Sequence, residues 1–339
     1  MIPCVEFRGE VAVTEEDFQR LLAAVGALSP GQRDALVAAI RAKGEAATAE
    51  PAVTDNPARD VGPIADIEAR FAVEPACPHC GAKAVIKWGS ANGLRRYRCK
   101  PCKVTFNALT GTPLAQLHKR ELWSGHAAAL VDGISLRKVA SRIGVHVETA
   151  FRWRHRFQKA PKALKPRVLT GTVEADESYF LKSEKGSRKL ARPARKRGGK
   201  ATKRGLSDEQ VPVLIARDRN KATTDQILPD RSAQSIAAVL EPVVDKSAVL
   251  VSDGAQAYRA FANRASLPHV ALNLSEGERV WGIYHIQNVN NYDSRLKTWM
   301  RRFNGVATKY LDSYLGWHRT NDREGDALSA SYMLAAALG

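Results

Sequence analysis

Two aspartates, Asp176 and Asp253, have the sequence surroundings of a metal-dependent active site. Asp176 lies within the segment 172–180, and Asp253 follows the apolar run 248–251 after one serine. Each is predicted to end a buried strand. Two such carboxylates can hold a pair of divalent cations about 3.5–4 Å apart, the spacing that serves in-line attack on a phosphodiester. The predicted chemistry is therefore phosphoryl transfer with Mg²⁺ or Mn²⁺.

The elements that must position this pair follow the order strand, strand, short strand, helix, strand. Apolar residues at alternate positions mark a second strand over 211–215, and residues 222–228 predict a third. Residues 232–244 predict an amphipathic helix before the buried strand at 249–251. This order builds an RNase H-like mixed sheet flanked by helices, with the two carboxylates on adjacent central strands.

A third active-site group is expected from a later helix, predicted over 285–302. No glutamate stands in that segment. Asn290, Asp293, Ser294 and Lys297 have the spacing i, i+3, i+4, i+7 and share one helical face. This stripe is either a surface face with an Asp293–Lys297 ion pair or the face that turns towards the metals.

Four cysteines form two knuckles upstream of the predicted sheet. Cys77 and Cys80 are separated by two residues, as are Cys99 and Cys102, with eighteen residues between the two pairs. Paired knuckles at this separation hold tetrahedral zinc in a ribbon. Because all four positions are protein ligands, the predicted Zn²⁺ is structural rather than catalytic. The fifth cysteine, Cys4, is expected to be a free thiol.

Two helices with a glycine turn between them follow the knuckles. Residues 134–145 predict the first helix, Gly144 supplies the turn, and residues 147–157 predict the second. The pattern is typical of a helix-turn-helix, although an ordinary helical hairpin has the same periodicity. The arginines of the second helix favour DNA binding. The predicted DNA-contacting residues are His146, Thr149, Arg152 and Arg154.

The charge balance favours a polyanionic partner. The chain of 339 residues carries a formal net charge of +17. Eleven Lys or Arg and one acid lie between Lys182 and Arg204. Such a run is usually a solvated loop, but this one directly follows the strand of Asp176, so we expect a DNA-clamping insertion that includes Arg195, Lys196 and Arg197.

No targeting segment is evident, and membrane association is not expected. Residues 1–6 lack a basic region followed by an apolar one, and no run of about 18 apolar residues occurs anywhere in the chain. We therefore expect a cytoplasmic protein, associated with the nucleoid through DNA.

The sequence divides into five predicted parts, which together make a multidomain α/β protein. Changes in composition, periodicity and turn residues set the boundaries. The parts are an N-terminal helical segment at 1–43, a linker with a short helix at 44–74, a zinc ribbon at 75–108, an all-α helix-turn-helix region at 109–167, and an RNase H-like catalytic domain at 168–339.

With these motifs, the chain resembles bacterial insertion-sequence transposases that join a zinc ribbon to an ISXO-type RNase H-like domain. The resemblance rests on the cysteine knuckles and on the segments 176–179, 252–254 and 285–302. It also includes matching residues over 305–317, and it covers most of 63–320.

The resemblance implies a set of active-site residues. Such enzymes carry Asp, Asp and then Glu or Asn, with a lysine seven residues further on. By that pattern Asp176 and Asp253 are followed by Asn290 and Lys297. The family pattern has a histidine at the position of Asp293, where this chain departs from it, and the departure makes Asp293 an alternative metal ligand.

The implied activity is that of a DNA transposase. It would bind the ends of an insertion sequence, cut there, and join the freed 3′-OH to target DNA while working as a homo-oligomer on DNA. The alternative is a catalytically inactive DNA-binding regulator descended from such an enzyme. A more distant alternative, a zinc-ribbon adaptor of the transcription machinery, is disfavoured by the strand-end aspartates.

Overall fold

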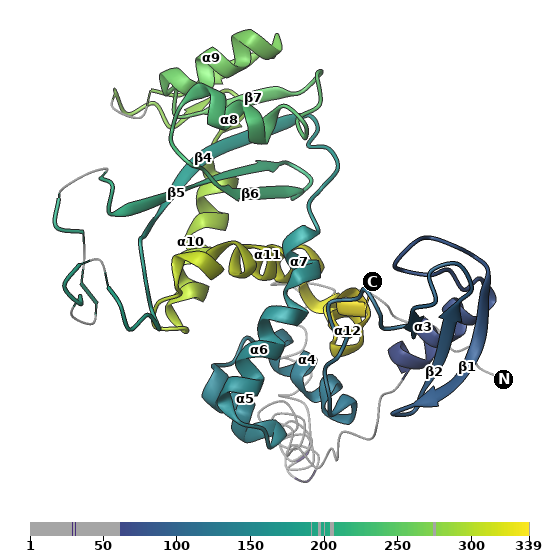
Figure 1. Cartoon of the computed structure of the whole chain (residues 1–339). Helices are drawn as coiled ribbons and strands as arrows, with labels where there is room; N and C mark the ends of the chain where they lie inside the picture. The colour runs from purple at the N-terminus through teal and green to yellow at the C-terminus, as the bar shows by residue number, and fades with distance from the viewer. Residues whose placement is uncertain are drawn as a thin grey trace. The chain divides into compact units, whose positions relative to one another are not determined.

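The computed structural model describes most of the chain beyond residue 61 (Figure 1). The described residues are 29, 31, 62–190, 192–195, 198–199, 201–203, 207–273 and 276–338. The helical segment predicted at 1–43 and the linker that follows it lie outside them, as does Cys4. The chain separates into two units, 1–58 and 59–339, and the elements below belong to the second.

A five-stranded mixed sheet forms the centre of the C-terminal half. Its strands are ordered β6-β5-β4-β7-β8, with β4 antiparallel to β5 and parallel to β7. This confirms the predicted sheet, with β4 and β7 as adjacent central strands. The strand bounds are β4 (Thr172–Leu181), β5 (Gln210–Asp218), β6 (Thr223–Ile227), β7 (Val249–Ser252) and β8 (His269–Ala271).

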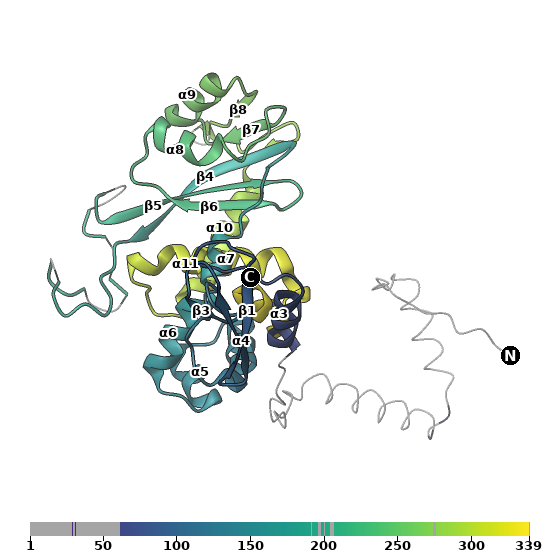
Figure 2. The same cartoon turned by 45° about the vertical axis from the view of Figure 1, so that its right-hand side comes forward.

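Helices cover both faces of this sheet (Figure 2). Successive residues of β4 point to opposite faces, so Val173 and Ala175 join the core under two helices while Glu174 points towards the other two. Apolar residues of β5 alternate between the two cores in the same way. The first pair of helices is α8 (Ala233–Leu240) and α9 (Gln256–Ala265), and the second is α10 (Gln287–Arg301) and α11 (Thr308–Glu324).

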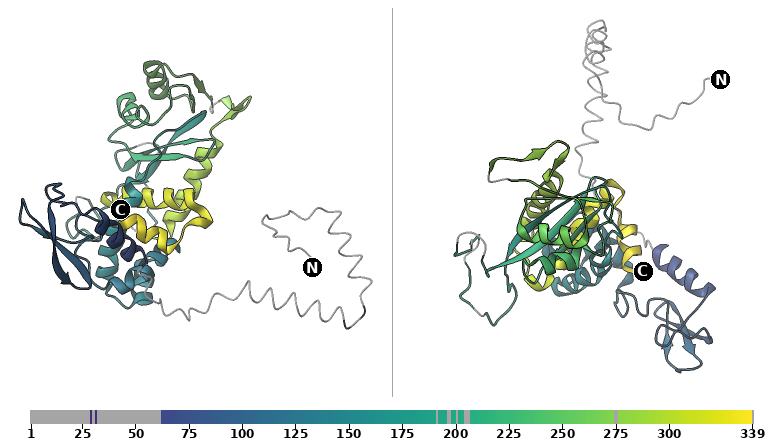
Figure 3. Two further views of the ribbon diagram at one scale, coloured as in Figure 1. Left: turned by 90° about the vertical axis from the view of Figure 1, so that its right-hand side faces the viewer. Right: turned by 90° about the horizontal axis from the view of Figure 1, so that it is seen from above.

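Two helix boundaries differ from the predicted ones. The helix predicted over 232–244 ends at Leu240, because Pro242 has no N–H to continue the helical hydrogen bonds and its ring clashes with the carbonyl four residues earlier. The helix predicted over 285–302 begins only at Gln287. Its first predicted residue belongs instead to β10 (Tyr284–His285), which pairs with β9 (Val280–Trp281) in a separate hairpin (Figure 3).

The cysteine-containing region is a three-stranded antiparallel sheet beside a helix. Phe71 of the helix contacts Tyr97 and Phe106 of the sheet, with ring centroids 5.3 and 5.9 Å away. The sheet buries few other apolar residues. A core this small usually needs a structural metal to be stable. The elements are α3 (Gly62–Val73), β1 (Val85–Ala91), β2 (Leu94–Cys99) and β3 (Thr105–Phe106).

The helix-turn-helix prediction is confirmed in its geometry. Gly144 ends the first helix with a φ of 67°, a left-handed conformation that glycine adopts without strain. Val139, Ala140 and Ala150 pack between the helices, and the small Ala140 permits their close approach. The elements are η1 (Arg120–Leu122), α4 (Trp123–Val131), α5 (Leu136–Ile143), α6 (Val147–Phe157) and α7 (Lys159–Ala163).

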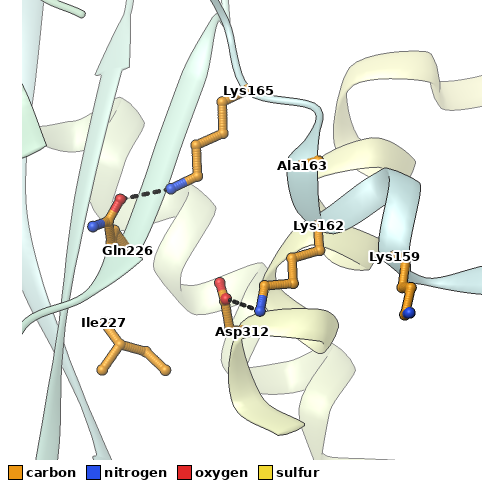
Figure 4. Close-up of a pocket in the computed structure, with 7 residues that line it drawn as sticks. All are labelled: Lys159, Lys162, Ala163, Lys165, Gln226, Ile227 and Asp312. Carbon is orange, nitrogen blue, oxygen red and sulfur yellow. Dashed lines mark hydrogen bonds and ion pairs between the residues drawn. The ribbon is translucent and has the colours of Figure 1, made fainter. Parts of the chain in front are cut away.

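The connector between α7 and the sheet is held in place by polar contacts. Lys165 Nζ donates to Gln226 Oε1 of β6 over 2.7 Å, and Lys162 Nζ lies 2.7 Å from Asp312 of α11 (Figure 4). At Gly316 of α11, a Cβ atom would lie only 2.5 Å from the backbone of Lys162. Glycine therefore allows α7 and α11 to touch, and the helix-turn-helix is docked onto the C-terminal half.

The last helix returns to the helical region. In α12 (Ala330–Leu338), buried Met333 and Leu334 join the same apolar core as Ile64 of α3 and Trp123 of α4. Among the described residues, no helix is long and apolar enough to cross a bilayer.

Buried His126 of α4 predicts a pH-dependent stability. Its ring lies 5.0 Å from Phe157 and 5.6 Å from Trp153, and neither ring nitrogen has a hydrogen-bond partner among the described residues. Burial, and then the charge of Arg154, lower the pKa of His126 to about 3. The unfolded chain therefore binds a proton below pH 6.5 that the folded chain does not, and stability falls with acidification.

We expect this group alone to cost on the order of 2 kcal/mol of unfolding free energy between pH 7 and pH 5. In His126→Phe, which keeps a ring but cannot titrate, urea unfolding at the two pH values should show that much less acid destabilisation. His118→Phe is a matched control because His118 is exposed. If His126→Phe lost as much unfolding free energy between pH 7 and pH 5 as the wild type, His126 would not be a buried, neutral ring in the folded protein.

Candidate functional site

Asp176 and Asp253 come together as predicted from the strand order. On β4 and β7, Glu174 pairs with Val251, an offset of 77 residues that extends to Asp176 opposite Asp253 (176 + 77 = 253). Asp253 directly follows β7, as expected. The prediction that Asp176 ends its strand is wrong, because β5 continues to pair with β4 as far as Leu181. Strand pairing between β4 and β7, in contrast, ends at Glu174, so the backbone of Asp176 has no strand partner on the β7 side.

Negative charge accumulates at this point of the sheet. Burial, then the charges of Asp253, Glu177 and Asp293, raise the pKa of Asp176 to about 7, although its Oδ1 accepts the Glu177 N–H over 2.8 Å. Burial also raises the pKa of Glu177, and the charge of Asp253 adds to this effect. Oxygen ligands of this kind suit hard cations, and a divalent ion would relieve the mutual repulsion of the carboxylates.

The stripe predicted on α10 has features of both interpretations given for it, a surface ion pair and a face turned towards the metals. Lys297 Nζ donates to Asp293 Oδ2 over 2.6 Å, which is the predicted ion pair. The other oxygen of Asp293 is buried and has no hydrogen-bond partner among the described residues, and its charge acts on Asp176. Asn290 and Ser294 are exposed. Asp293 therefore has one oxygen engaged and one available to a cation.

The four cysteines form a compact cluster of the size that a zinc ion needs. The Sγ atoms of Cys77 and Cys102 are 3.6 Å apart, as are those of Cys80 and Cys99, and all four lie within 4.8 Å of one another. Tetrahedral Zn–S bonds of about 2.3 Å imply sulfur separations of about 3.8 Å. The donor set and its spacing therefore fit zinc, and no other group of three or more His, Cys, Asp or Glu in the described part of the chain is as compact.

Backbone turns hold these thiols on one side of each knuckle. The N–H of Gly81 donates to the Cys77 carbonyl over 2.8 Å, and that of Lys103 donates to the Cys99 carbonyl over 3.0 Å. Both donors have positive φ, 72° and 63°. Each knuckle therefore ends in a tight turn at the residue after its second cysteine.

The predicted recognition helix is α6, and most of its predicted contact residues face out. Arg152 is exposed and pairs with Glu148 over 2.6 Å. Such an exposed pair is weak, so Arg152 can leave it for a base edge. His146 is exposed, and its Nδ1 caps the helix by accepting the Glu148 N–H. Thr149 is half-buried.

The burial of Arg154 disfavours the DNA contact predicted for it, which stays a prediction. Arg154 is 1% exposed and its guanidinium donates to the Ile134 carbonyl over 2.7 Å. It also lies over the rings of Trp317 and Phe303, at 5.2 and 5.7 Å. The side chain is on the opposite side of α6 from Arg152, so it joins the helix-turn-helix to α11 instead of facing solvent.

The predicted basic insertion leaves β4 and extends from the sheet (Figure 2). Its first residues are anchored, because Lys185 Nζ donates to the carbonyls of Phe303, Asn304 and Gly305 over 2.7–3.1 Å. Arg195 donates to the Lys182 carbonyl over 2.6 Å and is largely buried by the loop. Lys196 and Arg197 lie outside the described residues.

A groove runs from the helix-turn-helix to the base of this insertion. Its cations are Arg137, Lys185 and Lys309, together with the buried Arg154, and no carboxylate lines it. Phe151 of α6 and Tyr310 of α11 form part of its walls. The groove has the charge and the aromatic side chains that suit a nucleic-acid strand.

Sequence reasoning missed Glu174, which is completely buried and binds the start of α10. The available signal was its position two residues before Asp176, which places both side chains on one face of β4. A carboxylate predicted at a buried strand position requires a partner, but the partner lies more than a hundred residues away in the sequence.

Comparison with known proteins agrees with this architecture. Residues 168–317 match the model of the ISXO2-like transposase domain, and residues 119–165 match that of a homeodomain-like domain. A protein of the transposable element ISH50 from Halobacterium salinarum is 30% identical over 244 residues, which cover 70% of this chain and 82% of the relative. The chain belongs to the insertion-sequence transposases that carry an ISXO2-like domain.

Solved structures give weaker matches. A simian T-cell lymphotropic virus intasome in complex with a PP2A regulatory subunit is 7% identical, with a TM-score of 0.29, over 62% of this chain and 74% of that one. A pre-cleavage Mos1 transpososome is 12% identical, with a TM-score of 0.20, over 64% and 78% of the two chains. Similarities at this level carry no argument about this chain.

Proposed function

We propose that this DNA transposase binds the ends of its element and performs metal-dependent strand cleavage and strand transfer. The observation that carries the proposal is the register of β4 and β7, which sets Asp176 opposite Asp253. These two carboxylates would hold two Mg²⁺ or Mn²⁺ ions, with Asn290 or Asp293 as the third ligand. The bound ions would supply Lewis-acid stabilisation of the attacking and leaving oxygens.

The chain's own groups have separate roles in this proposal. Asp176 and Asp253 would hold the ions, and the bound ions would orient the reacting phosphodiester. Lys297, exposed on α10, contacts a phosphate beside the scissile bond.

The test is cleavage of a DNA duplex that carries the element end. Purified protein with Mg²⁺ should nick the end and expose a 3′-OH, and it should then join that end to a target plasmid. Binding of the end without cleavage in either Mg²⁺ or Mn²⁺ would favour the alternative, a catalytically inactive regulator. Size measurement on the bound end tests the proposed homo-oligomer.

The cysteine cluster is proposed to bind one structural zinc ion. Purified protein should contain one equivalent of zinc, and Cys99→Ser should release it. Because the ribbon buries little apolar surface, we expect loss of the metal to unfold this region. Elemental analysis and proteolysis of residues 75–108 check both expectations. A metal-free ribbon that stays folded and resists protease would contradict them.

Two surfaces are proposed to bind DNA in different ways. Arg152→Ala should reduce the preference for the element end over random DNA, because an arginine on a recognition helix reads base edges. Arg188→Gln with Lys189→Gln removes two exposed cations of the insertion. This pair should weaken binding to all sequences and lower the slope of log affinity against log salt by about 2.

Fluorescence anisotropy over a salt series separates the two effects. Arg137→Gln, in the groove between these surfaces, should resemble the insertion variant if DNA passes through the groove. If the insertion variant changed sequence preference and Arg152→Ala changed only the salt slope, this division of roles would be wrong.

A further inference from the structure

Glu174 is a buried carboxylate that the proposed chemistry does not use. It lies on β4, has no exposed surface, and shares a face with Asp176 two residues along the strand. A carboxylate withdrawn from water is costly unless hydrogen bonds and opposite charge compensate it. The partners that compensate Glu174 therefore indicate what it holds in place.

The first set of partners is the opening turn of α10. Glu174 Oε2 accepts the backbone N–H of Asn288 over 2.7 Å and that of Val289 over 3.0 Å, and Oε1 accepts Asn288 Nδ2 over 2.8 Å. The residue preceding the helix, Ile286, offers no side-chain cap. Glu174 thus satisfies two of the unpaired N–H groups at the helix start, and its charge faces the positive end of the helix dipole.

The second set of partners comes from two other elements, and Arg219 supplies its positive charge. Arg219, just beyond β5, lies 3.2 Å from Glu174 Oε1, and His285 Nδ1 of β10 lies 3.4 Å from the same oxygen. The guanidinium of Arg219 also donates to the Ile283 carbonyl over 3.1 Å. One carboxylate therefore joins β4, the end of β5, the hairpin and α10.

We propose that Glu174 is a positioning residue, which fixes α10 on β4 so that Asp293 meets Asp176 at the metal site. The inference rests on the proposed function. Asp293 lies four residues, about one helical turn, beyond Val289, whose N–H Glu174 holds. Asp176 lies two residues beyond Glu174 on the strand. A shift at this junction changes the separation of the two carboxylates directly.

The test is Glu174→Gln, which keeps the side-chain shape and replaces one acceptor oxygen by a donor group. The amides of Asn288 and Val289 should exchange hydrogen faster. Binding of Mn²⁺ to the DNA-free protein, measured by electron paramagnetic resonance with Asp176→Asn as the blank, should weaken by about tenfold, as for other supporting residues of metal ligands. Cleavage should need correspondingly more Mg²⁺, with end binding unchanged.

The matched control is Asp218→Asn. Asp218 is 3% exposed and accepts the backbone N–H groups of Thr170, Asn220 and Ala222, which are not part of α10. It should lower the melting temperature and leave Mn²⁺ affinity unchanged. If Glu174→Gln behaved like this control, Glu174 would serve stability alone and the inference would be overturned.

A second variant decides the matter if Glu174→Gln does not fold. Arg219 has a side chain that is 33% exposed, so Arg219→Gln is expected to fold, and it should weaken Mn²⁺ binding to a smaller degree. Unchanged Mn²⁺ affinity in that variant would then overturn the inference. Wild-type protein that binds Mn²⁺ but never cuts DNA would refute the proposed function, while exchange and Mn²⁺ binding would still decide the role of Glu174.

Discussion

Replacement of Asp176 or Asp253 by asparagine is expected to abolish strand cleavage and to leave DNA binding near the wild-type level. Each substitution removes a carboxylate ligand from a site where burial, and then the charges of neighbouring carboxylates, raise the pKa of Asp176 to about 7. We expect a loss of at least about 10²-fold in the cleavage rate, since removal of preorganised charge stabilisation costs that much elsewhere. Single-turnover cleavage of a labelled element end measures it.

The chain offers a matched control for this experiment. Asp253 Oδ1 accepts the N–H of Ala255 over 3.0 Å, and Asp245 Oδ1 accepts that of Ser247 over 2.8 Å, so both aspartates cap the same kind of local turn. Asparagine preserves this turn bond in each case. Asp245→Asn should therefore cut DNA normally. If Asp253→Asn lost end binding together with cleavage, its role would be structural.

Local patterns were sufficient to predict four of the five strands of the central sheet, but the short edge strand β8 was missed. Alternating apolar residues identified β5, and the apolar run before Asp253 identified β7, because each pattern reports burial on the element itself. The spacing of the cysteines and the glycine at position 144 are also local signals, because each sets the backbone conformation of a turn of a few residues. These features specify the zinc ribbon, the helix-turn-helix and the placement of Asp176 beside Asp253 without reference to distant contacts.

Local patterns were insufficient where distant segments decide the environment of a side chain. Arg154 has the spacing of a DNA-contacting residue, yet it is buried by Phe303 and Trp317 from the other half of the chain. Glu174 was overlooked because its partners, among them Asn288, become neighbours only after α10 docks on β4. Tertiary packing, which periodicity does not encode, determined both outcomes.

The identity of the third ligand gives the second large expected effect. The lysine spacing of the family pattern assigns the position to Asn290, and that assignment stays a prediction. The geometry favours Asp293 as the group that supplies charge. Its Oδ1 is buried and unpartnered among the described residues, its charge acts on Asp176, and Asn290 is exposed. A hard cation also prefers a carboxylate to a neutral amide.

We therefore expect Asp293→Ala to reduce Mg²⁺-dependent cleavage by about tenfold or more, and Asn290→Ala to reduce it less. Asp293→Asn separates charge from shape, and Mn²⁺, which binds most ligand sets more tightly than Mg²⁺, should restore part of its activity. Lys297→Met frees Asp293 Oδ2 without removing the carboxylate, and Mn²⁺ binding to the DNA-free variant separates loss of the ion pair from loss of the phosphate contact proposed for Lys297.

Metal titrations of cleavage by the four variants distinguish the alternatives. If only Asn290→Ala loses activity, the family pattern holds and the unpartnered oxygen of Asp293 has no metal. If neither alanine variant is affected, the exposed stripe of α10 is a solvent face, and two carboxylates from β4 and β7 must hold the ions alone. If Asp293→Ala loses more activity than Asn290→Ala, the residue that departs from the family pattern is the metal ligand. The helix α10 places position 293 near Asp176 whichever residue occupies it, so an aspartate there can take over the role.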